Sequence, residues 1–457
     1  MATARRKKTK KTKEPADLLQ PLLAAIDADD TAAIANTLTG LHPADIADLL
    51  ESMSPTQRPA MWAQVDPRLM GEVLLELPET VRGGLVELMD DKALITAARE
   101  LDTDDIADLL PELSDEVIAE ILFALDNQNR RRLDQVLSYP EDTAGGLMNV
   151  DAITVRENLT LEVVLRYLRR RAELPESTNK LFVVDRNDQL IGQLLVGKIL
   201  TADPARRVSQ VMDRDPVSFN VLTTDKEVAA AFERYNLISA PVVDDQNRLL
   251  GRITVDDVVD VLREVADHSI MAPAGLSEAE DIFAPVLRAS GRRAVWLGVN
   301  LVTAFIASWV ISFFESTIEK AVALAVLMPI VASMGGNAGT QTLTLVVRGL
   351  ALGTITTANA RRVLVRELMV GAVNGVLWAL VVAGVVVLWY RNYLLGLLIG
   401  AAMLINLAFA ALSGAIIPVI VRRLGVDPAL ASGVILTTVT DVAGFLAFLG
   451  LAAWFLV

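Results

Sequence analysis

Five long apolar stretches after residue 290 constrain this chain most strongly. Crossing the hydrocarbon core of a membrane takes about 20 helical residues, and each stretch meets that requirement. The stretches predict transmembrane helices near residues 294–314, 320–347, 363–390, 394–421 and 429–457. We therefore interpret the C-terminal part as a five-helix α transmembrane domain. An odd number of spans places its two ends on opposite sides of the membrane.

The charge of the chain divides at the same place. Residues 1–287 hold 31 Lys and Arg against 51 Asp and Glu, whereas residues 288–457 hold 11 against 5. The formal charge of −14 therefore combines −20 in a water-soluble part with +6 in a membrane part. Cysteine is absent and only two histidines occur, which excludes disulfides and Cys-rich or His-rich metal sites. Any metal chemistry must rest on oxygen ligands.

Basic residues near the span ends predict the orientation, because cytoplasmic loops keep an excess of Lys and Arg. One side receives only Lys320 and Arg391. The other side receives nine arginines, namely Arg288, Arg292, Arg293, Arg348, Arg361, Arg362, Arg366, Arg422 and Arg423. We therefore expect the acidic N-terminal half to lie in the cytoplasm and the C-terminus to lie outside.

Asp441 is the most unusual residue of the predicted spans. It lies near the middle of the fifth span, which contains no Lys or Arg to pair with it. A charge at the bilayer centre costs about 2.5 to 3.5 kcal/mol even on insertion scales. The second span contains Pro329 and the polar, glycine-rich segment 335–341, which predict a loosened, broken helix whose exposed carbonyls face protein or a water-filled path. The glycines also fit close contact between helices, which is compatible with a pore role. Together these features favour a cation pathway over a carboxyl that serves only helix packing.

An internal repeat organises the region before the membrane domain. Residues 181–200 align without gaps with residues 240–259, at an offset of 59 and with six of twenty positions identical. Each copy predicts a strand, a polar turn, a second strand and a helix start. Upstream, each copy has a further short strand and then a helix. The two helices begin near residues 160 and 225. The pattern resembles a tandem cystathionine-β-synthase (CBS) pair, which is an α/β domain.

The first 145 residues predict helices only. Residues 41–50 and 101–110 share the amphipathic core Asp-Ile-Ala-Asp-Leu-Leu, which indicates an all-α helical solenoid.

The seven basic residues between Arg5 and Lys13 precede no apolar stretch, so we expect a disordered, solvated arm rather than a signal peptide, and no nucleic acid as partner. The expected multidomain order is the basic arm over 1–14, the acidic N-domain over 15–145, the CBS pair over 146–261, a linking (plug) helix within 262–287 and the transmembrane domain over 288–457.

This order of domains, with Gly-Gly-Asn-x-Gly-x-Gln at 335–341 and Thr-Asp-x-x-Gly at 440–444, resembles the MgtE family of magnesium channels and transporters over nearly the whole chain. The chain departs from the family pattern at Gly146, where a basic residue is more usual, and at His268, where glutamate is common. The resemblance implies magnesium uptake across the bacterial inner membrane by a homodimer. The homodimer would be embedded in membrane lipid, and the second and fifth spans would line its pore. Asp441 would recognise the ion. The sequence offers no convincing catalytic constellation, so we expect no enzyme.

Magnesium binds oxygen ligands in octahedral geometry at about 2.0 to 2.1 Å and sheds its water reluctantly. Two copies of Asp441 on the twofold axis would therefore hold a hydrated ion through its waters, weakly enough for release. Further hydrogen bonds would come from Asn337, Thr340, Gln341 and the carbonyls of Gly335 and Gly336. Co²⁺ and Mn²⁺ stay alternatives, because oxygen ligands serve several hard cations. The unpaired Asp441 disfavours a CBS-regulated anion channel.

The acidic surplus suggests how cytosolic Mg²⁺ would regulate such a protein. At low Mg²⁺ the facing carboxylates of the N-domain and the CBS pair repel one another, and bridging ions would draw them together. By resemblance, the compact state positions the linking helix, roughly 262–283, to close the pore. Four acidic residues, Asp256, Asp260, Glu264 and Asp267, recur at helical spacing on one face. The full set of candidate sensor ligands is Asp104, Asp105, Asp108, Gly145, Asp225, Asp256, Asp257, Asp260, Glu264 and Asp267.

The second CBS unit also predicts a nucleotide site. Residues 251–257 match the glycine, Thr/Ser and Asp spacing that CBS units use for ATP, with Thr254 toward phosphate and Asp257 toward the ribose hydroxyls. The first copy has Leu195 and Lys198 at the matching positions. Only the second copy therefore fits ATP as a cofactor.

Overall fold

The computed structural model describes residues 15–456 apart from short gaps, and the chain separates into two compact units. The gaps are residues 100, 102, 111–112, 125–129, 131–132, 134, 172–173, 176, 278–279, 352 and 357. Unit 1 comprises Met1–Ala266 and Ala279–Pro285, and unit 2 comprises Asp267–Glu278 and Val286–Val457. The arm predicted over residues 1–14 lies outside the described residues.

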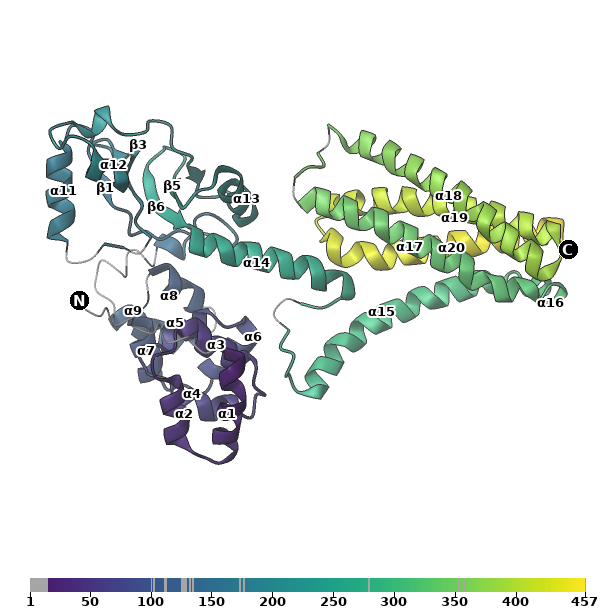
Figure 1. The fold of residues 1–457 in the computed structure, drawn as a ribbon, viewed down its shortest axis with the longest axis horizontal. Coiled ribbons are helices and arrows are strands. Elements are labelled where there is room, and N and C mark those ends of the chain that lie inside the picture. The colour runs from purple at the N-terminus through teal and green to yellow at the C-terminus, as the bar shows by residue number, and fades with distance from the viewer. Residues whose placement is uncertain are drawn as a thin grey trace, which may run out of the picture. The chain divides into compact units, whose positions relative to one another are not determined.

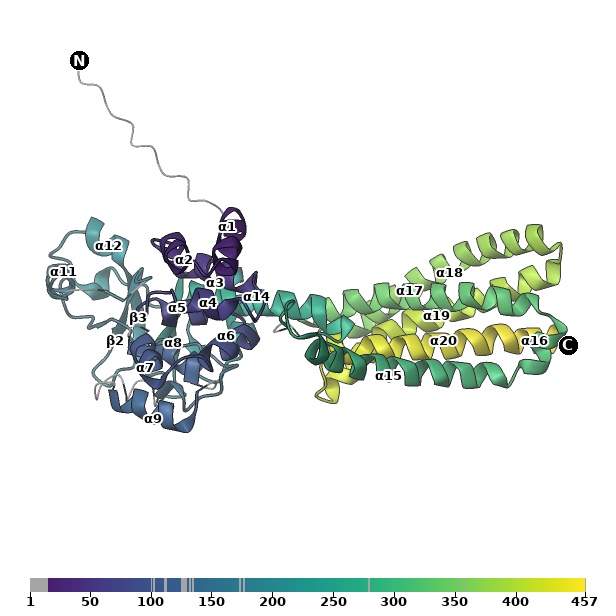
Figure 2. The ribbon, with the colours of Figure 1, turned by 90° about the horizontal axis from the view of Figure 1, so that it is seen from below.

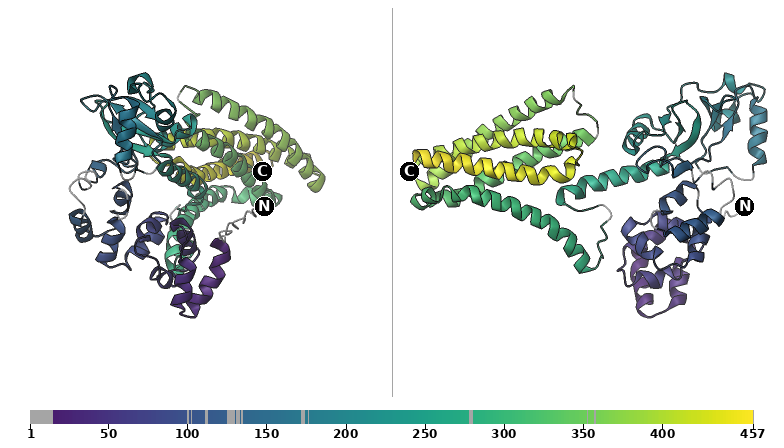
Figure 3. Two further views of the ribbon diagram at one scale, coloured as in Figure 1. Left: turned by 60° about the vertical axis from the view of Figure 1, so that its left-hand side comes forward. Right: turned by 180° about the vertical axis from the view of Figure 1, so that it is seen from behind.

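The described N-terminal part of unit 1 consists of short helices without a β-strand, which confirms the predicted all-α N-domain (Figures 1 and 3). The odd-numbered helices pack in series, with α1 on α3, α3 on α5, α5 on α7 and α7 on α9, as in a helical solenoid. Their bounds are α1 Pro15–Asp27, α2 Thr31–Leu38, α3 Pro43–Glu51, α4 Arg58–Trp62, α5 Met70–Leu75, α6 Glu79–Val86, α7 Asp91–Arg99, α8 Thr103–Leu109 and α9 Asp115–Ala124.

The repeated Asp-Ile-Ala-Asp-Leu-Leu core buries its apolar residues in the same way in both copies. Leu49 and Leu50 are buried at α3, and their counterparts Leu109 and Leu110 are buried at α8. Both pairs belong to one hydrophobic core that extends through the N-domain. Pro43 occupies the first position of α3, where its missing N–H has no helical partner to lose. The amphipathic spacing read from the sequence therefore decides which helix face turns inward.

Two three-stranded sheets with matching registers confirm the tandem CBS pair. In each sheet the first strand is parallel to the second, and the second is antiparallel to the third. Lys180 pairs with Leu195 in the first sheet and Ser239 pairs with Thr254 in the second, which reproduces the offset of 59. The strands are β1 Thr154–Val155, β2 Lys180–Val184, β3 Leu190–Leu195, β4 Phe219–Asn220, β5 Ser239–Val243 and β6 Leu249–Thr254. The helices are α11 Leu161–Arg170, α12 Val196–Thr201, η2 Val208–Gln210, α13 Asp225–Tyr235 and α14 Val255–Met271.

The predicted linking helix is correct in kind but wrong in extent. Helix α14 begins directly after β6 and ends at Met271 instead of continuing to residue 283. A 3₁₀ turn, η3 (Ala272–Ala274), follows it. Pro273 lacks the N–H that a longer helix needs, and Gly275 adopts a left-handed conformation with φ of 71°, which is a common helix stop.

Five helices long and apolar enough to cross a membrane form most of unit 2, as the sequence predicted. They contain 27 to 31 residues, or about 40 to 47 Å at about 1.5 Å per residue, which exceeds the hydrocarbon thickness. A short helix, α16 (Glu315–Lys320), lies at the same end of the bundle as the C-terminus (Figures 1 and 2) and was not predicted. The long helices are α15 Val286–Ser312, α17 Ala323–Ala351, α18 Ala360–Tyr390, α19 Tyr393–Arg423 and α20 Pro428–Phe455.

Helix α19 is the centre of this bundle. It packs against α17, α18 and α20, and its small residues let the neighbouring backbones approach closely. A Cβ added at Gly414 of α19 would lie 2.6 Å from the carbonyl oxygen of Gly339 in α17. Gly371 and Gly375 of α18 meet α19 in the same way. Helices α17 and α20 also contact each other, and they carry the polar residues singled out in the sequence.

Candidate functional site

A polar stripe runs along the outward face of α17. Asn337, Thr340, Gln341 and Thr344 are all exposed on the single chain, although they lie in the middle of an apolar span. Their described hydrogen bonds stay within α17, such as Thr340 Oγ1 to the Gly336 carbonyl at 2.9 Å. Polar groups are costly against lipid, so this face is suited to water or to another protein surface.

Asp441 lies on α20 and is half-buried. In the part of the chain that the structure describes, no Lys, Arg or His forms an ion pair with it. Thr437, one turn earlier, is exposed, and its hydroxyl donates to the Gly433 carbonyl of its own helix at 3.0 Å. The carboxylate therefore keeps its capacity to accept hydrogen bonds from a hydrated cation.

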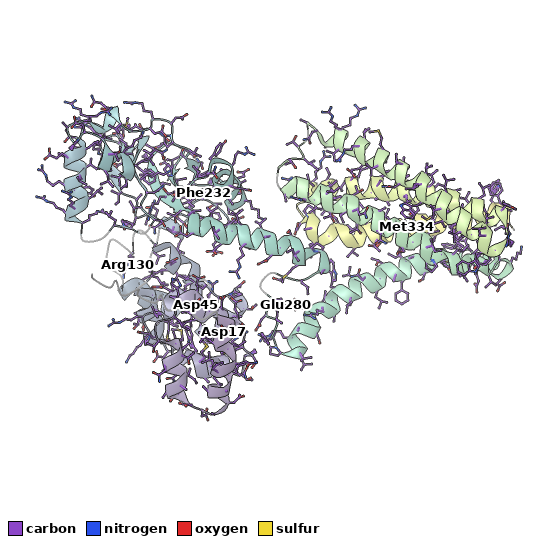
Figure 4. All side chains as sticks on the ribbon, viewed as in Figure 1. Asp17, Asp45, Arg130, Phe232, Glu280 and Met334 are labelled. Carbon is purple, nitrogen blue, oxygen red and sulfur yellow. The ribbon has the colours of Figure 1, made fainter. Side chains whose placement is uncertain are left out.

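Contacts between α17 and α20 show at which depth in the bundle Asp441 lies relative to the polar stripe. Gly339 faces Leu436, and Gly444 faces Val331, so both contacts fit one antiparallel register. In that register Asp441 is level with Met334, which Figure 4 labels on α17 in the middle of the bundle. Asn337 then lies three residues away, or about 4.5 Å along the helix axis. The fold thus brings two predicted ion-contacting residues to nearly the same depth.

The glycines of the second span do not loosen it. Helix α17 is continuous from Ala323 to Ala351 and includes Pro329, so the predicted break is wrong. The carbonyls of Gly335 and Gly336 lie inside this helix, where backbone carbonyls accept from N–H groups one turn later. Gly335 is buried against Asn406 of α19, whereas a Cβ at Gly336 would meet nothing within 4 Å. Close helix packing therefore explains Gly335.

Among the candidate sensor ligands, Gly145 and Asp225 lie on two segments that pair with each other. The junction pairs with the second CBS unit, where Gly145 N donates to the Val221 carbonyl at 2.9 Å and Asp225 N donates to the Asp142 carbonyl at 3.1 Å. A Cβ at Gly145 would overlap Tyr139 and Val221. Only glycine therefore fits this junction without movement.

The other sensor candidates lie on α8 and α14. Helix α14 is continuous through Asp256, Asp260, Glu264 and Asp267, so their spacing places them along one face, as predicted. Asp257 lies beside this series, and Asp105 is partly buried in α8. The side chains of Asp104 and Asp108 lie outside the described residues. Within the described parts, no three His, Asp or Glu side chains are close enough together to hold a metal ion.

Charges of the N-domain and the first part of α14 influence one another within unit 1. Partial burial raises the pKa of the Glu51 carboxyl, an effect that the positive charge of Arg263 opposes. Asp260 is exposed, yet the loss of surrounding water raises the pKa of its carboxyl. The negative charge of Asp256 raises this pKa further, and the positive charge of Arg263 opposes both effects. These carboxyls hold their protons more readily than free ones, and a bound cation would reverse that preference.

The predicted nucleotide residues Thr254 and Asp257 contact each other at the start of α14. The Asp257 Oδ2 atom accepts from Thr254 N at 3.1 Å and from Thr254 Oγ1 at 3.0 Å. Thr254 is buried. This arrangement gives the pair a local role at the helix start in addition to any contact with a nucleotide.

Two long-range contacts were missed by the sequence analysis. In unit 1, Arg58 of the N-domain forms a buried ion pair with Asp281, with Nη1 and Oδ2 2.6 Å apart. In unit 2, His268 Nε2 lies 2.6 Å from Oδ2 of Asp427, the residue that caps α20. Partners so far apart in the sequence share no local pattern, so spacing gave no signal for either contact.

Known protein families match the N-domain, the CBS pair and the membrane domain of this chain. Family models match at residues 41–142 (MgtE intracellular N domain), at 144–204 and 208–264 (CBS domain) and at 328–451 (divalent cation transporter). The magnesium transporter MgtE of Thermus thermophilus is 33% identical over 437 residues, which are 94% of this chain and 96% of the relative. The chain belongs to the MgtE family. The magnesium transporter MgtE of Bacillus subtilis is 31% identical over 91% of this chain and 92% of its own length.

Two solved structures each align with about half of this chain. The cytosolic domain of the Mg²⁺ channel MgtE in complex with ATP is 32% identical, covers 53% of this chain and 99% of that chain, and has a TM-score of 0.49. The soluble part of a magnesium transporter is 22% identical, covers 55% of this chain and 100% of that chain, and has a TM-score of 0.47. The MgtE family consists of magnesium transporters and not enzymes, in agreement with the expectation from the sequence.

Proposed function

We propose that this MgtE protein is a Mg²⁺-selective channel for magnesium uptake across the bacterial inner membrane. The observation that carries the proposal is the polar face shared by α17 and α20, where half-buried Asp441 lies near the depth of Asn337, and Asn337 is exposed on the single chain. In a homodimer, two such faces would enclose a polar path through the lipid. Two Asp441 carboxylates would then hold hydrated Mg²⁺ through its waters, assisted by Asn337, Thr340 and Gln341.

The proposal includes orientation and regulation. Nine arginines at the predicted inner ends favour cytoplasmic N-terminal domains and an outside C-terminus. Cytosolic Mg²⁺ would bridge the acidic surfaces of the N-domain, the CBS pair and α14, and so close the channel. Loss of surrounding water raises the pKa values of Glu51 and Asp260, and neighbouring carboxylates add to the shift; a divalent ion beside such carboxyls would favour their charged form. The domain boundaries at residues 14, 145, 261 and 287, transport of Co²⁺ or Mn²⁺, and ATP binding through Thr254 and Asp257 stay predictions.

The pore assignment is tested by Mg²⁺ flux into liposomes that contain the purified protein. Asp441→Ala should abolish the flux, because the path loses its only described membrane-centre carboxylate on α20. Glu319→Gln removes an exposed carboxylate on α16 and should leave the flux unchanged. Flux of wild-type size through Asp441→Ala would refute the pore assignment.

A further inference from the structure

Asn406 of α19 is a fully buried amide between the two helices of the proposed ion path, with an exposed fraction of 0%. Its Nδ2 atom donates to the Val331 carbonyl of α17 at 2.8 Å. Its Oδ1 atom has no hydrogen-bond partner among the described residues. A buried acceptor without a partner costs stability, and an apolar side chain of similar size would avoid that cost.

Glycines from two different helices make room for this amide. A Cβ added at Gly335 of α17 would overlap the Asn406 side chain, and one added at Gly444 of α20 would lie 2.7 Å from Asn406 Nδ2. Gly335 precedes Asn337 by two residues, and Gly444 follows Asp441 by three. The amide therefore contacts both helices within one turn of the residues that are proposed to contact the ion.

We propose that Asn406 is a positioning residue that fixes the separation and register of the ion-contacting faces of α17 and α20. The inference rests on the proposed function. The hydrogen bond to the Val331 carbonyl fixes the height of α17 along α19, and the two glycines fix how closely both helices approach the amide. A slip of α17 by one residue, about 1.5 Å, changes the spacing between Asn337 and Asp441. The fit to a hydrated ion depends on that spacing.

The test measures ion selectivity, which a merely structural role would not change. Proteoliposomes receive Mg²⁺ or Co²⁺ alone, and the flux ratio is determined for Asn406→Leu and Gly335→Ala. Both variants should change the ratio of Mg²⁺ to Co²⁺ flux by about tenfold, equivalent to about 1.4 kcal/mol. Gly450→Ala is the matched control on α20, because a Cβ there would meet nothing within 4 Å, and it should keep the wild-type ratio. The quantity of folded protein, from gel filtration in detergent, normalises each flux.

A double variant separates a direct contact from general damage. Asn406→Ala removes the side chain that a Cβ at Gly335 would meet, so adding Gly335→Ala should cause little further change. Independent, additive effects would overturn the proposal, and so would wild-type flux ratios in both Asn406→Leu and Gly335→Ala. If Asn406→Leu does not fold, Asn406→Ser provides the same comparison with a smaller side chain.

Asp441→Asn, measured in parallel, distinguishes this inference from the proposed function. Loss of Mg²⁺ flux in Asp441→Asn together with wild-type selectivity in the Asn406 variants would refute only the positioning role. Wild-type flux through Asp441→Asn would refute the pore assignment on which the inference depends.

Discussion

Arg58 and Asp281 form a buried, two-point ion pair within unit 1. The Arg58 guanidinium donates through Nη1 and Nη2 to the two Asp281 oxygens at 2.6 and 3.0 Å, and through Nε to the Leu50 carbonyl at 2.9 Å. The side chains expose 6% and 9% of their surface. Asp281 Oδ1 also accepts from Phe283 N at 2.9 Å. The pair thus attaches the segment that precedes the first membrane helix to the N-domain.

Asp281→Ala should release that segment. An unpaired buried guanidinium costs about 3 to 5 kcal/mol, so Arg58 gains more by opening to water than by staying in place. The Ala284 amide donates to the Asp281 backbone carbonyl at 3.1 Å, an acceptor that this variant keeps. Hydrogen exchange at Ala284 of the full-length protein in detergent should become at least about tenfold faster, the change expected from about 1.4 kcal/mol. Glu162→Ala removes an exposed partner of Arg166 and should leave that amide unchanged. Full protection of the Ala284 amide in Asp281→Ala would show that other contacts hold the segment.

The pH dependence of this contact follows from the shifted carboxyl. Burial alone would raise the pKa of Asp281, but the hydrogen bonds from Arg58 and Phe283 and the charge of Arg58 outweigh it and lower the pKa below its usual range. A lowered folded-state pKa stabilises above the unfolded value of about 3.9, and this stabilisation is lost as the pH falls through the folded value. The melting-temperature difference between wild type and Asp281→Asn should therefore be constant near neutrality and shrink below about pH 4.

At the scale of a single element, α14 carries the acidic face that is proposed to sense Mg²⁺. Asp256, Asp260 and Glu264 are exposed along it, and mutual repulsion decreases when a divalent ion binds between them and another acidic surface. Neutralising the face with Asn at Asp256, Asp260 and Asp267 and Gln at Glu264 should leave Mg²⁺ flux high at about ten millimolar cytosolic-side Mg²⁺, where the wild type should close if the proposed sensing is correct.

The matched control for this face neutralises four exposed glutamates outside the candidate set. Gln is placed at Glu87, Glu162, Glu227 and Glu233, which removes the same number of carboxylates from the chain. Closure should persist in this control if position rather than total charge decides sensing. Closure in the α14 variant equal to that of the wild type would assign sensing to other carboxylates.

Most elements could be predicted from the sequence because their signals are local. Apolar length predicted all five membrane helices, and the offset of 59 predicted the strand pairs of both CBS units down to equivalent pairings. The end of α14 was missed although Pro273 and Gly275 mark it, because the linking helix was extended by resemblance. The short α16 lacked the length that identifies a span.

The candidate site could be predicted only in part, for a physical reason. The sequence shows that Asn337 and Asp441 are polar residues within apolar spans. It does not show which face of α17 meets α19. Gly335 and Gly336 are adjacent in sequence and lie on different faces, so one packs against Asn406 and the other remains open. Contacts such as Arg58 with Asp281 depend on tertiary packing across more than two hundred residues, and no local pattern encodes them.

At the scale of the whole molecule, the proposed homodimer would cover the polar face of α17 and α20. One chain leaves Asn337, Thr340 and Thr437 exposed, and hydroxyl and amide groups in lipid cost free energy unless water or protein covers them. An isologous twofold interface would place each polar face opposite its own copy. In the proposed dimer, closed symmetry would thus turn a costly surface into the wall of a hydrated path.

Because the chain contains no cysteine, single introduced thiols can test this arrangement. Thr437→Cys should be linked between copies in the membrane by a short bismaleimide, since both thiols would lie near the twofold axis within one turn of Asp441. Leu380→Cys provides the control, because α18 packs on α19 and Leu380 exposes 69% of its surface away from the polar face. The linked dimer, seen on a denaturing gel, should form with Thr437→Cys and not with Leu380→Cys. Equal linking at both positions, or linking at Leu380 alone, would place the twofold axis elsewhere and separate Asp441 from its proposed counterpart.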